Sequence, residues 1–128
     1  MRLSTVVLLL LAVGCSAPTA PTVVGQWGGP VASLVLAPAG GTLSYQCGSG
    51  TVDSTWTLSA NGRFVGTGQH FIGGGPVPAQ GRPPHPALYV GQVDGDYLTL
   101  TVTLTDLNQT LGPFRLARGG APVAEVCV

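Results

Sequence analysis

The chain has 128 residues and a formal net charge of zero, and only 8% of its residues are charged. This length fits one domain of ordinary size. After residue 14 the basic side chains are four dispersed arginines, with no lysine, so the composition excludes the basic face with which a nucleic-acid-binding protein neutralises phosphates.

The first 14 residues have the pattern of a secretory signal peptide. Arg2 supplies the positive charge, an apolar run extends from Leu3 to Val13, and Gly14 is a small residue directly before Cys15. The apolar run is shorter than the roughly 20 residues that a membrane-spanning helix needs. We therefore expect residues 1–14 to be removed during export.

The four residues Ala12-Val13-Gly14-Cys15 resemble the lipobox of bacterial lipoproteins, in which the first position is usually Leu, Val or Ile. The resemblance implies cleavage before Cys15, a diacylglyceryl group on its sulfur and acylation of the new amino group. Two or three acyl chains anchor a protein stably to a membrane. Ser16 stands where an Asp would retain such proteins in the inner membrane, which favours an outer-membrane location if the source has one. The alternative is an ordinary signal peptide in which Cys15 is incidental.

Residues 15–22 comprise this cysteine and a small, proline-containing segment, which we expect to be a flexible tether. Using Cys15 for lipid leaves Cys47 and Cys127 as an even pair in an oxidising compartment, so we expect them to form a disulfide. Closing a loop of about 80 residues would stabilise the fold by roughly 4 kcal/mol if loop-closure entropy dominates. Two free, buried thiols are the alternative.

Residues 23–128 are predicted to form a single all-β domain. Strands and turns alternate at short spacing, and no stretch has a helical period. The pattern indicates a small antiparallel up-and-down β-barrel of about eight strands, with a β-sandwich as the alternative. The expected strands are Val24–Gly28, Ala32–Ala37, Thr42–Cys47, Ser54–Ser59, Arg63–Phe71, Ala87–Val93, Asp96–Thr105, Gly112–Arg118 and Ala124–Val128.

The clearest strand covers residues 97–105, where leucine or valine at even positions alternates with threonine at odd positions after Tyr97. Such alternation places the apolar residues against a core and the threonines toward water. Asn61-Gly62 and Asp94-Gly95 supply the positive φ that tight hairpins require, so the strands on either side should be antiparallel neighbours.

A long segment from Gly73 to Pro86 interrupts the regular spacing of strands and turns. Loops of this length are usually functional or mobile, and its prolines should stiffen it. We expect it to be an interaction loop to which Arg82, His85 and the nearby His70 contribute. A tolerated surface insertion is the alternative.

The first strand begins with Gly25-Gln26-Trp27, which resembles the Gly-X-Trp start of lipocalin-like and avidin-like barrels. In those families the tryptophan closes one end of the barrel and packs against a basic residue from a late strand. The resemblance implies that Arg118 stacks on Trp27 here, a cation–π contact worth roughly 1 kcal/mol. The alternative is a core tryptophan that simply begins a strand.

A second resemblance is to the periplasmic inhibitors of C-type lysozyme, which are often lipoproteins. In that family a Tyr-X-Cys early in the domain pairs with a cysteine at the C-terminus, as Tyr45-Gln46-Cys47 and Cys127 would here. The inhibitory loop of the family has no counterpart in this chain. The resemblance therefore covers the disulfide alone, and the inhibitory activity does not carry over.

No motif points to catalysis, and His70 and His85 lack the neighbouring ligands that a metal site needs. We expect no cofactor, no metal and no enzymatic activity. The sequence indicates an exported, lipid-anchored module of the cell envelope with a non-enzymatic binding or interaction role, whose partners are the membrane through Cys15 and an envelope protein or a small apolar ligand. An inhibitor of a hydrolase such as lysozyme or a protease, and a carrier of a small apolar ligand, are the alternatives. A carrier requires an internal cavity, whereas an interaction module requires a filled core and an ordered projecting loop.

Overall fold

The computed structural model describes residues 22–74 and 76–122, and it contains antiparallel β-structure with no helix in these residues. The strands are β1 (Gly25–Gly28), β2 (Ala32–Ala37), β3 (Gly40–Tyr45), β4 (Gly48–Val52), β5 (Thr57–Leu58), β6 (Arg63–Ile72), β7 (His85–Asp94), β8 (Tyr97–Leu104) and β9 (Gln109–Arg118).

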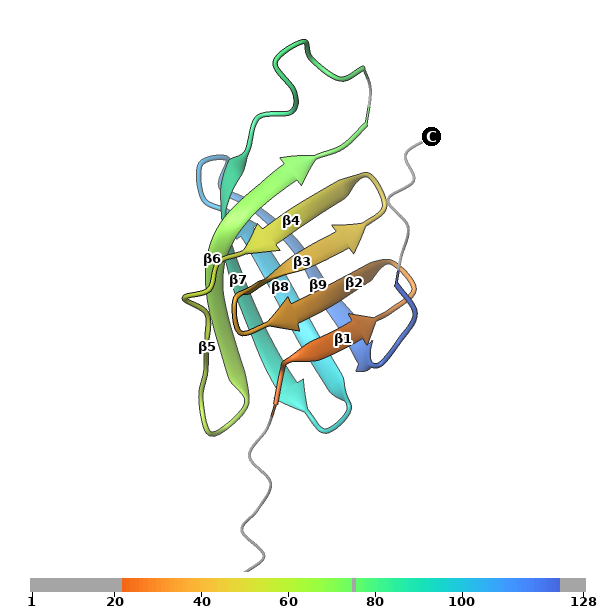
Figure 1. Ribbon diagram of the computed structural model, residues 1–128, viewed down its shortest axis with the longest axis vertical. Helices are drawn as coiled ribbons and strands as arrows, with labels where there is room; N and C mark the ends of the chain where they lie inside the picture. Colours follow the sequence, from red (N-terminus) through yellow and green to blue (C-terminus); the bar gives the residue numbers. More distant parts are fainter. Residues whose placement is uncertain (1–21, 75, 123–128) are drawn as a thin grey trace, which may run out of the picture.

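The strands form one closed barrel. Along the sheet the order is β4-β3-β2-β1-β9-β8-β7-β6-β5, and β4 also pairs with β6, which joins the two sides of the sheet. Eight strands therefore close the barrel, while β5 is an extra strand beside the first half of β6. Figure 1 shows β1 to β4 crossing in front of β6 to β9. The predicted antiparallel up-and-down barrel is confirmed, and the sandwich alternative is not.

Because the strands alternate in direction, the barrel has two distinct ends. The proximal end is where the chain enters β1 after residues 22–24 and where β9 ends. The turns at 38–39 and 95–96 also lie at this end. At the distal end lie the turns at 46–47 and 105–108 and the long loop 73–84. In Figure 1 this loop rises above the barrel, on the opposite side from the point where the chain enters.

The core follows from the alternation along the strands. In β8 the even-numbered residues Leu98 to Leu104 are buried, while the threonines between them are exposed or half-buried, as predicted. The buried hydrophobic residues come from both halves of the barrel: Val23, Trp27, Ala32, Leu34, Leu36, Leu43, Val52, Phe64, Ala87, Tyr89, Val93, Leu98, Leu100, Val102, Leu104 and Leu116.

β4, with the sequence Gly-Ser-Gly-Thr-Val, was not among the expected strands. Its glycines allow the strand to pass close to two aromatic rings. A Cβ added at Gly48 would lie 2.2 Å from the ring of Tyr45, and one added at Gly50 would lie 2.2 Å from the hydroxyl of Tyr89. These residues are glycine because the inward-pointing tyrosines occupy the space of their side chains.

The strand expected over residues 54–59 is reduced to the two residues of β5. Trp56, which precedes β5, contacts the end of β2 and the ring of Phe64. Its indole Nε1 donates a hydrogen bond to the carbonyl of Ala37 at 2.9 Å, and its ring lies 5.8 Å from that of Phe64. Tertiary contacts of one large ring therefore replace strand pairing in this segment.

Several other expected boundaries differ from the structure, and β3 covers 40–45 instead of 42–47. β9 begins at Gln109 instead of Gly112, and an irregularity opposite Leu100 and Val102 accommodates Pro113, which cannot donate a hydrogen bond to the ladder. β6 and β7 extend toward each other as far as Ile72 and His85, so the loop covers 73–84 instead of 73–86. The strand expected over residues 124–128 lies outside the described residues.

Candidate functional site

The interior of the barrel is filled by side chains. Trp27, Phe64 and Tyr89 are fully buried, and leucines from β2, β3, β8 and β9 pack among them. Tyr45, Trp56 and other half-buried rings pack against this core. The rings and leucines thus occupy the space in which a carrier barrel would hold its ligand.

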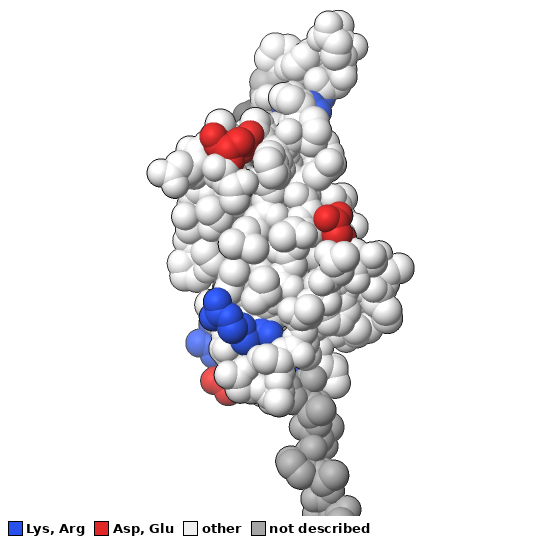
Figure 2. Space-filling model, turned by 90° about the vertical axis from the view of Figure 1, so that its left-hand side faces the viewer, with Lys and Arg blue, Asp and Glu red and all other residues white. Residues whose placement is uncertain are grey.

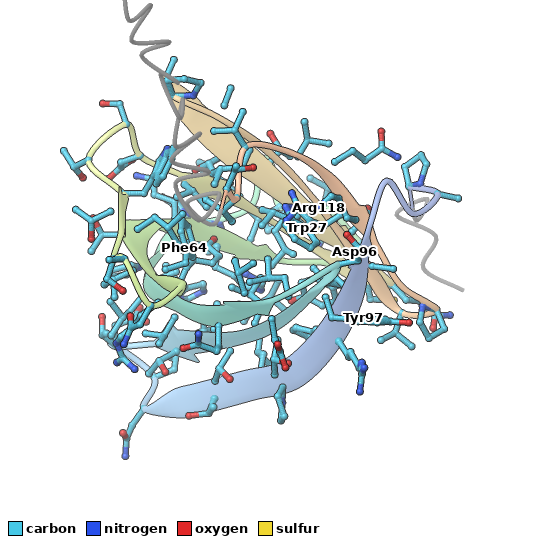
Figure 3. The ribbon with its side chains drawn as sticks, turned by 90° about the horizontal axis from the view of Figure 1, so that it is seen from below. Trp27, Phe64, Asp96, Tyr97 and Arg118 are labelled. Atoms are coloured by element: carbon cyan, nitrogen blue, oxygen red, sulfur yellow. The ribbon has the colours of Figure 1, made fainter. Side chains whose placement is uncertain are left out.

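At the proximal end, Trp27 and Arg118 make the contact that the Gly-X-Trp resemblance implied. The two residues are partners across β1 and β9, and the guanidinium carbon of Arg118 lies 4.3 Å from the centre of the Trp27 ring. Seen from this end, the two side chains lie together with Asp96 nearby (Figure 3). The indole Nε1 of Trp27 donates a hydrogen bond to the carbonyl of Val23 at 2.9 Å.

The same arginine holds the start of the domain in place. Its guanidinium donates hydrogen bonds to the carbonyl of Thr22 at 3.1 Å and to that of Gly95 at 3.3 Å. Asp96 lies 3.6 Å away, but its side chain is 88% exposed, so this ion pair contributes little to stability. Arg118 therefore joins the entering chain, the β7–β8 turn and the first strand.

At the distal end, the residues nearest to the loop form a buried polar contact. His70 is fully buried, and its Nε2 is hydrogen-bonded to the hydroxyl of Tyr45, whose ring stacks on the imidazole with centres 5.4 Å apart. The Nδ1 of His70 has no hydrogen-bond partner among the described residues. Leaving a buried polar atom unpaired costs about 1–3 kcal/mol.

Burial also determines the protonation of these groups. The pKa of His70 is lowered from its ordinary value, first by burial and then by the charge of His85. The pKa of Tyr89 is raised, mainly by burial, and its hydroxyl donates a hydrogen bond to the carbonyl of Gln69 at 2.7 Å. His70 and Tyr89 are therefore both held in their neutral forms at neutral pH.

His85, the first residue of β7, pairs with an acidic residue in the β8–β9 turn. Its Nδ1 lies 2.7 Å from a carboxylate oxygen of Asp106, in the β8–β9 turn, and the side chains of the two residues are 18% and 39% exposed. The backbone of His85 is directly opposite that of His70 across β6 and β7. The two histidines of the chain thus meet at the base of the loop.

The loop itself is held at its base by Arg82. The guanidinium donates hydrogen bonds to the carbonyl of Ile72 at 3.2 Å and to that of Gly74 at 2.9 Å. A turn bonds the amide of Gly81 to the carbonyl of Pro78 at 2.9 Å. Val77 is 64% exposed. The loop therefore combines a fixed base with an exposed, apolar outer part.

The residues chosen from the sequence as an interaction loop have different positions. His70 lies near the end of β6, as expected, but its side chain is buried, and Arg82 bonds the backbone at the base of its own loop. His85 is half-buried and paired. The contact of Tyr45 with His70 and that of Asp106 with His85 were not predicted. Tyr45 follows the inward-pointing Leu43 by two residues, which indicates that it points inward, whereas an Asp in a turn gives no such signal.

Of the three cysteines, the structure describes Cys47 alone, in the turn between β3 and β4. Its carbonyl accepts a hydrogen bond from the amide of Gly73 at 2.8 Å, so it lies beside the start of the loop. Cys15 and Cys127 lie outside the described residues, and the expected lipid attachment and disulfide stay predictions.

The outer surface carries a groove of about 380 Å³ between the β1–β2 turn and β9. Pro30, Val31, Phe114 and Tyr97 line it, and the guanidinium of Arg115 lies 4.1 Å from the centre of the Tyr97 ring at its margin. A smaller, polar groove of about 240 Å³ lies beside His85 and Asp53.

Charged side chains are sparse over the barrel wall. Figure 2 shows the face over β5, β6 and β7, where the acidic and basic groups form small clusters separated by an uncharged surface. The described charged residues are Asp53, Arg63, Arg82, Asp94, Asp96, Asp106, Arg115 and Arg118. Most of them are at strand ends or in turns and loops, so the wall presents mainly hydroxyl, amide and apolar groups.

The contacts of Arg118 at the proximal end, here called the clamp, predict that a substitution of this residue lowers stability measurably. Replacing Arg118 by Gln removes the stack on Trp27 and the bonds to the carbonyls of Thr22 and Gly95. The free energy of unfolding, measured by urea denaturation, should fall by about 1–2 kcal/mol. Arg63→Gln, which changes an exposed arginine at the start of β6, should change it by no more than about 0.5 kcal/mol. Equal losses for the two variants would show that the clamp is not stabilising.

Comparison of the chain with protein families, with curated proteins and with solved structures finds no match. In residues 22–74 and 76–122, no group of three or more His, Cys, Asp or Glu side chains is arranged to hold a metal ion. The part of the chain that the structure describes has no helix long and apolar enough to cross a membrane. A functional proposal therefore rests on the geometry of the two barrel ends.

Proposed function

We propose that the chain is an exported, lipid-anchored module of the cell envelope that binds a partner protein through its 73–84 loop and has no catalytic role. The observation that carries the proposal is the combination of a filled barrel with a loop that projects from one end and is fixed at its base by Arg82. Binding residues concentrate on loops that a rigid scaffold positions.

The positions of the two ends support this arrangement. The described chain begins with Thr22, which Arg118 holds at the proximal end. Six residues lie between it and Cys15, so the extended chain from Cys15 to Thr22 spans at most about 25 Å. If Cys15 carries lipid, the proximal end is kept near the membrane and the loop extends away from it, where a partner can reach it.

The filled interior favours protein interaction over carriage of a small apolar ligand. Fully buried aromatic rings occupy the middle of the barrel, and a ligand there would have to displace them. Inhibition of a hydrolase, the other alternative, uses the same projecting loop and differs from our proposal only in the identity of the partner.

The proposed lipid anchor predicts where a variant without Cys15 is found in the cell. Cys15→Ser should remove the site of acylation, and the protein should move from the membrane fraction to the soluble fraction after export, because acyl chains on Cys15 are the proposed anchor. Detergent partitioning and cell fractionation measure this. Retention of Cys15→Ser in the membrane fraction would contradict the lipoprotein proposal.

The proposed disulfide predicts that non-reducing mass spectrometry of the exported protein finds Cys47 and Cys127 in one linked peptide. Cys127→Ala should lower the free energy of unfolding by about 2–5 kcal/mol, as is usual when a native disulfide is removed from a small exported domain. Cys15→Ser supplies the matched control, because it removes a cysteine outside the proposed pair. Recovery of Cys47 and Cys127 as free thiols would refute the proposal.

The loop predicts separate effects on binding and on stability. Replacing residues 74–84 by a short Gly-Ser turn should leave the melting temperature nearly unchanged, because none of the residues that the structure describes in this segment, 74 and 76–84, belongs to the buried core. The same change should abolish capture of the envelope partner. A photo-crosslinking residue at Val77 should attach to that partner, whereas one at Thr99 on the barrel wall should not.

Binding that survives the loop replacement, or crosslinking from position 99 alone, would move the site to the barrel wall. A large fall in melting temperature would show that the loop is part of the packing instead.

A further inference from the structure

The two ends of the 73–84 loop join strands that bring both histidines of the chain together. His70 lies two residues before the end of β6, His85 is the first residue of β7, and their Cα atoms are paired across the two strands. Any change in the charge of either ring therefore acts at the point where the loop is attached.

The two rings have opposite environments. The Nδ1 of His85 lies 2.7 Å from the carboxylate of Asp106, so a protonated His85 has an anionic partner. His70 is fully buried, its Nε2 is bonded to the Tyr45 hydroxyl, and its Nδ1 has no acceptor among the described residues. A proton added to His70 would thus bring a buried positive charge and leave the Nδ1–H donor without an acceptor among the described residues.

Among the described residues, no carboxylate is hydrogen-bonded to His70. Its bonded neighbour is the phenol of Tyr45 from β3, Tyr89 from β7 is held neutral by its raised pKa, and the residue paired with His70 on β4 is Gly50. The carboxylate of Asp106 is already bonded to His85, and Asp53 lies beside the groove that His85 lines. Arg82, at the same loop base, adds a permanent positive charge.

We propose that His70 and His85 form an acid-sensitive contact that keeps the base of the 73–84 loop ordered at neutral pH and releases it in mild acid. The regulating ligand is the proton, and its effect depends on the different surroundings of the two imidazole rings. Its consequence, loss of partner binding in acid, rests on the proposed function of the loop.

The direction of the effect follows from the pKa of His70, which burial and the charge of His85 lower in the folded protein. An unfolded chain takes up this proton near the ordinary histidine pKa of about 6.5, before the folded one does. The neutral ring therefore stabilises the folded state fully above about pH 6.5, and this stabilisation is lost as the pH falls from there toward the lowered folded value.

Amide hydrogen exchange of the domain tests the proposal without any partner. Rates are measured by mass spectrometry at pH 7.5 and pH 5.0 and corrected for the intrinsic pH dependence of exchange. Peptides covering the ends of β6 and β7 and the loop should exchange at least tenfold faster at pH 5.0. The peptide covering β8, which includes residues 97–104, serves as the internal control and should change less than twofold.

Two variants assign the effect. His70→Phe and His70→Gln remove the buried titrating group, and at least tenfold acceleration at the loop base should then fall below twofold. His85→Gln removes the charge that lowers the pKa of His70, so it should shift the midpoint of the acceleration to higher pH and make the acceleration smaller. Proton NMR of the wild-type imidazoles locates the His70 titration directly, so the test does not depend on the variants folding.

Three results would overturn the proposal. They are exchange at the loop base that is unchanged by pH, acceleration that persists in both His70 variants, and acceleration of β8 together with the loop, which indicates global unfolding. Failure of the partner-binding role appears separately, as partner capture that survives replacement of the loop.

Discussion

The close approach of β4 to two tyrosine rings is the constraint on which the rest of the structure depends. The barrel closes because β4 pairs with β6, and this pairing requires glycine at positions 48 and 50, where Tyr45 and Tyr89 fill the space of absent side chains. The rings in turn complete the packing of the interior. The packing of the β4 glycines against the two tyrosine rings therefore allows the barrel to close, fills the core and positions the polar groups at the distal end.

The two ends of the barrel are built on different principles. At the proximal end an arginine lies over an indole and bonds exposed carbonyl groups, an arrangement that tolerates water. At the distal end a buried imidazole is hydrogen-bonded to a phenol, and its other nitrogen has no partner in the described part of the chain. The distal contact therefore depends on the protonation of a buried group, whereas the proximal contact does not.

The sequence predicted those features that come from local patterns. Alternation in residues 97–105 located β8 and its buried face, and the Gly-X-Trp start identified the contact between Trp27 and Arg118. β4 was missed because its small residues give no strand pattern, and Tyr89, whose hydroxyl fills the space at Gly50, is far away in the sequence. The burial of His70 was not predicted, because nothing near it in the chain indicates its contact with Tyr45 or the enclosing strands.

The sparse charge on the barrel wall has a consequence for how a partner would find this molecule. Long-range electrostatic steering raises association rates far above the 10⁵–10⁶ M⁻¹s⁻¹ of roughly neutral pairs, and salt suppresses it. With small clusters of opposite sign and a formal net charge of zero, this surface offers little such steering. Encounters would depend on diffusion and short-range fit, and their rate would change little between dilute and salty surroundings.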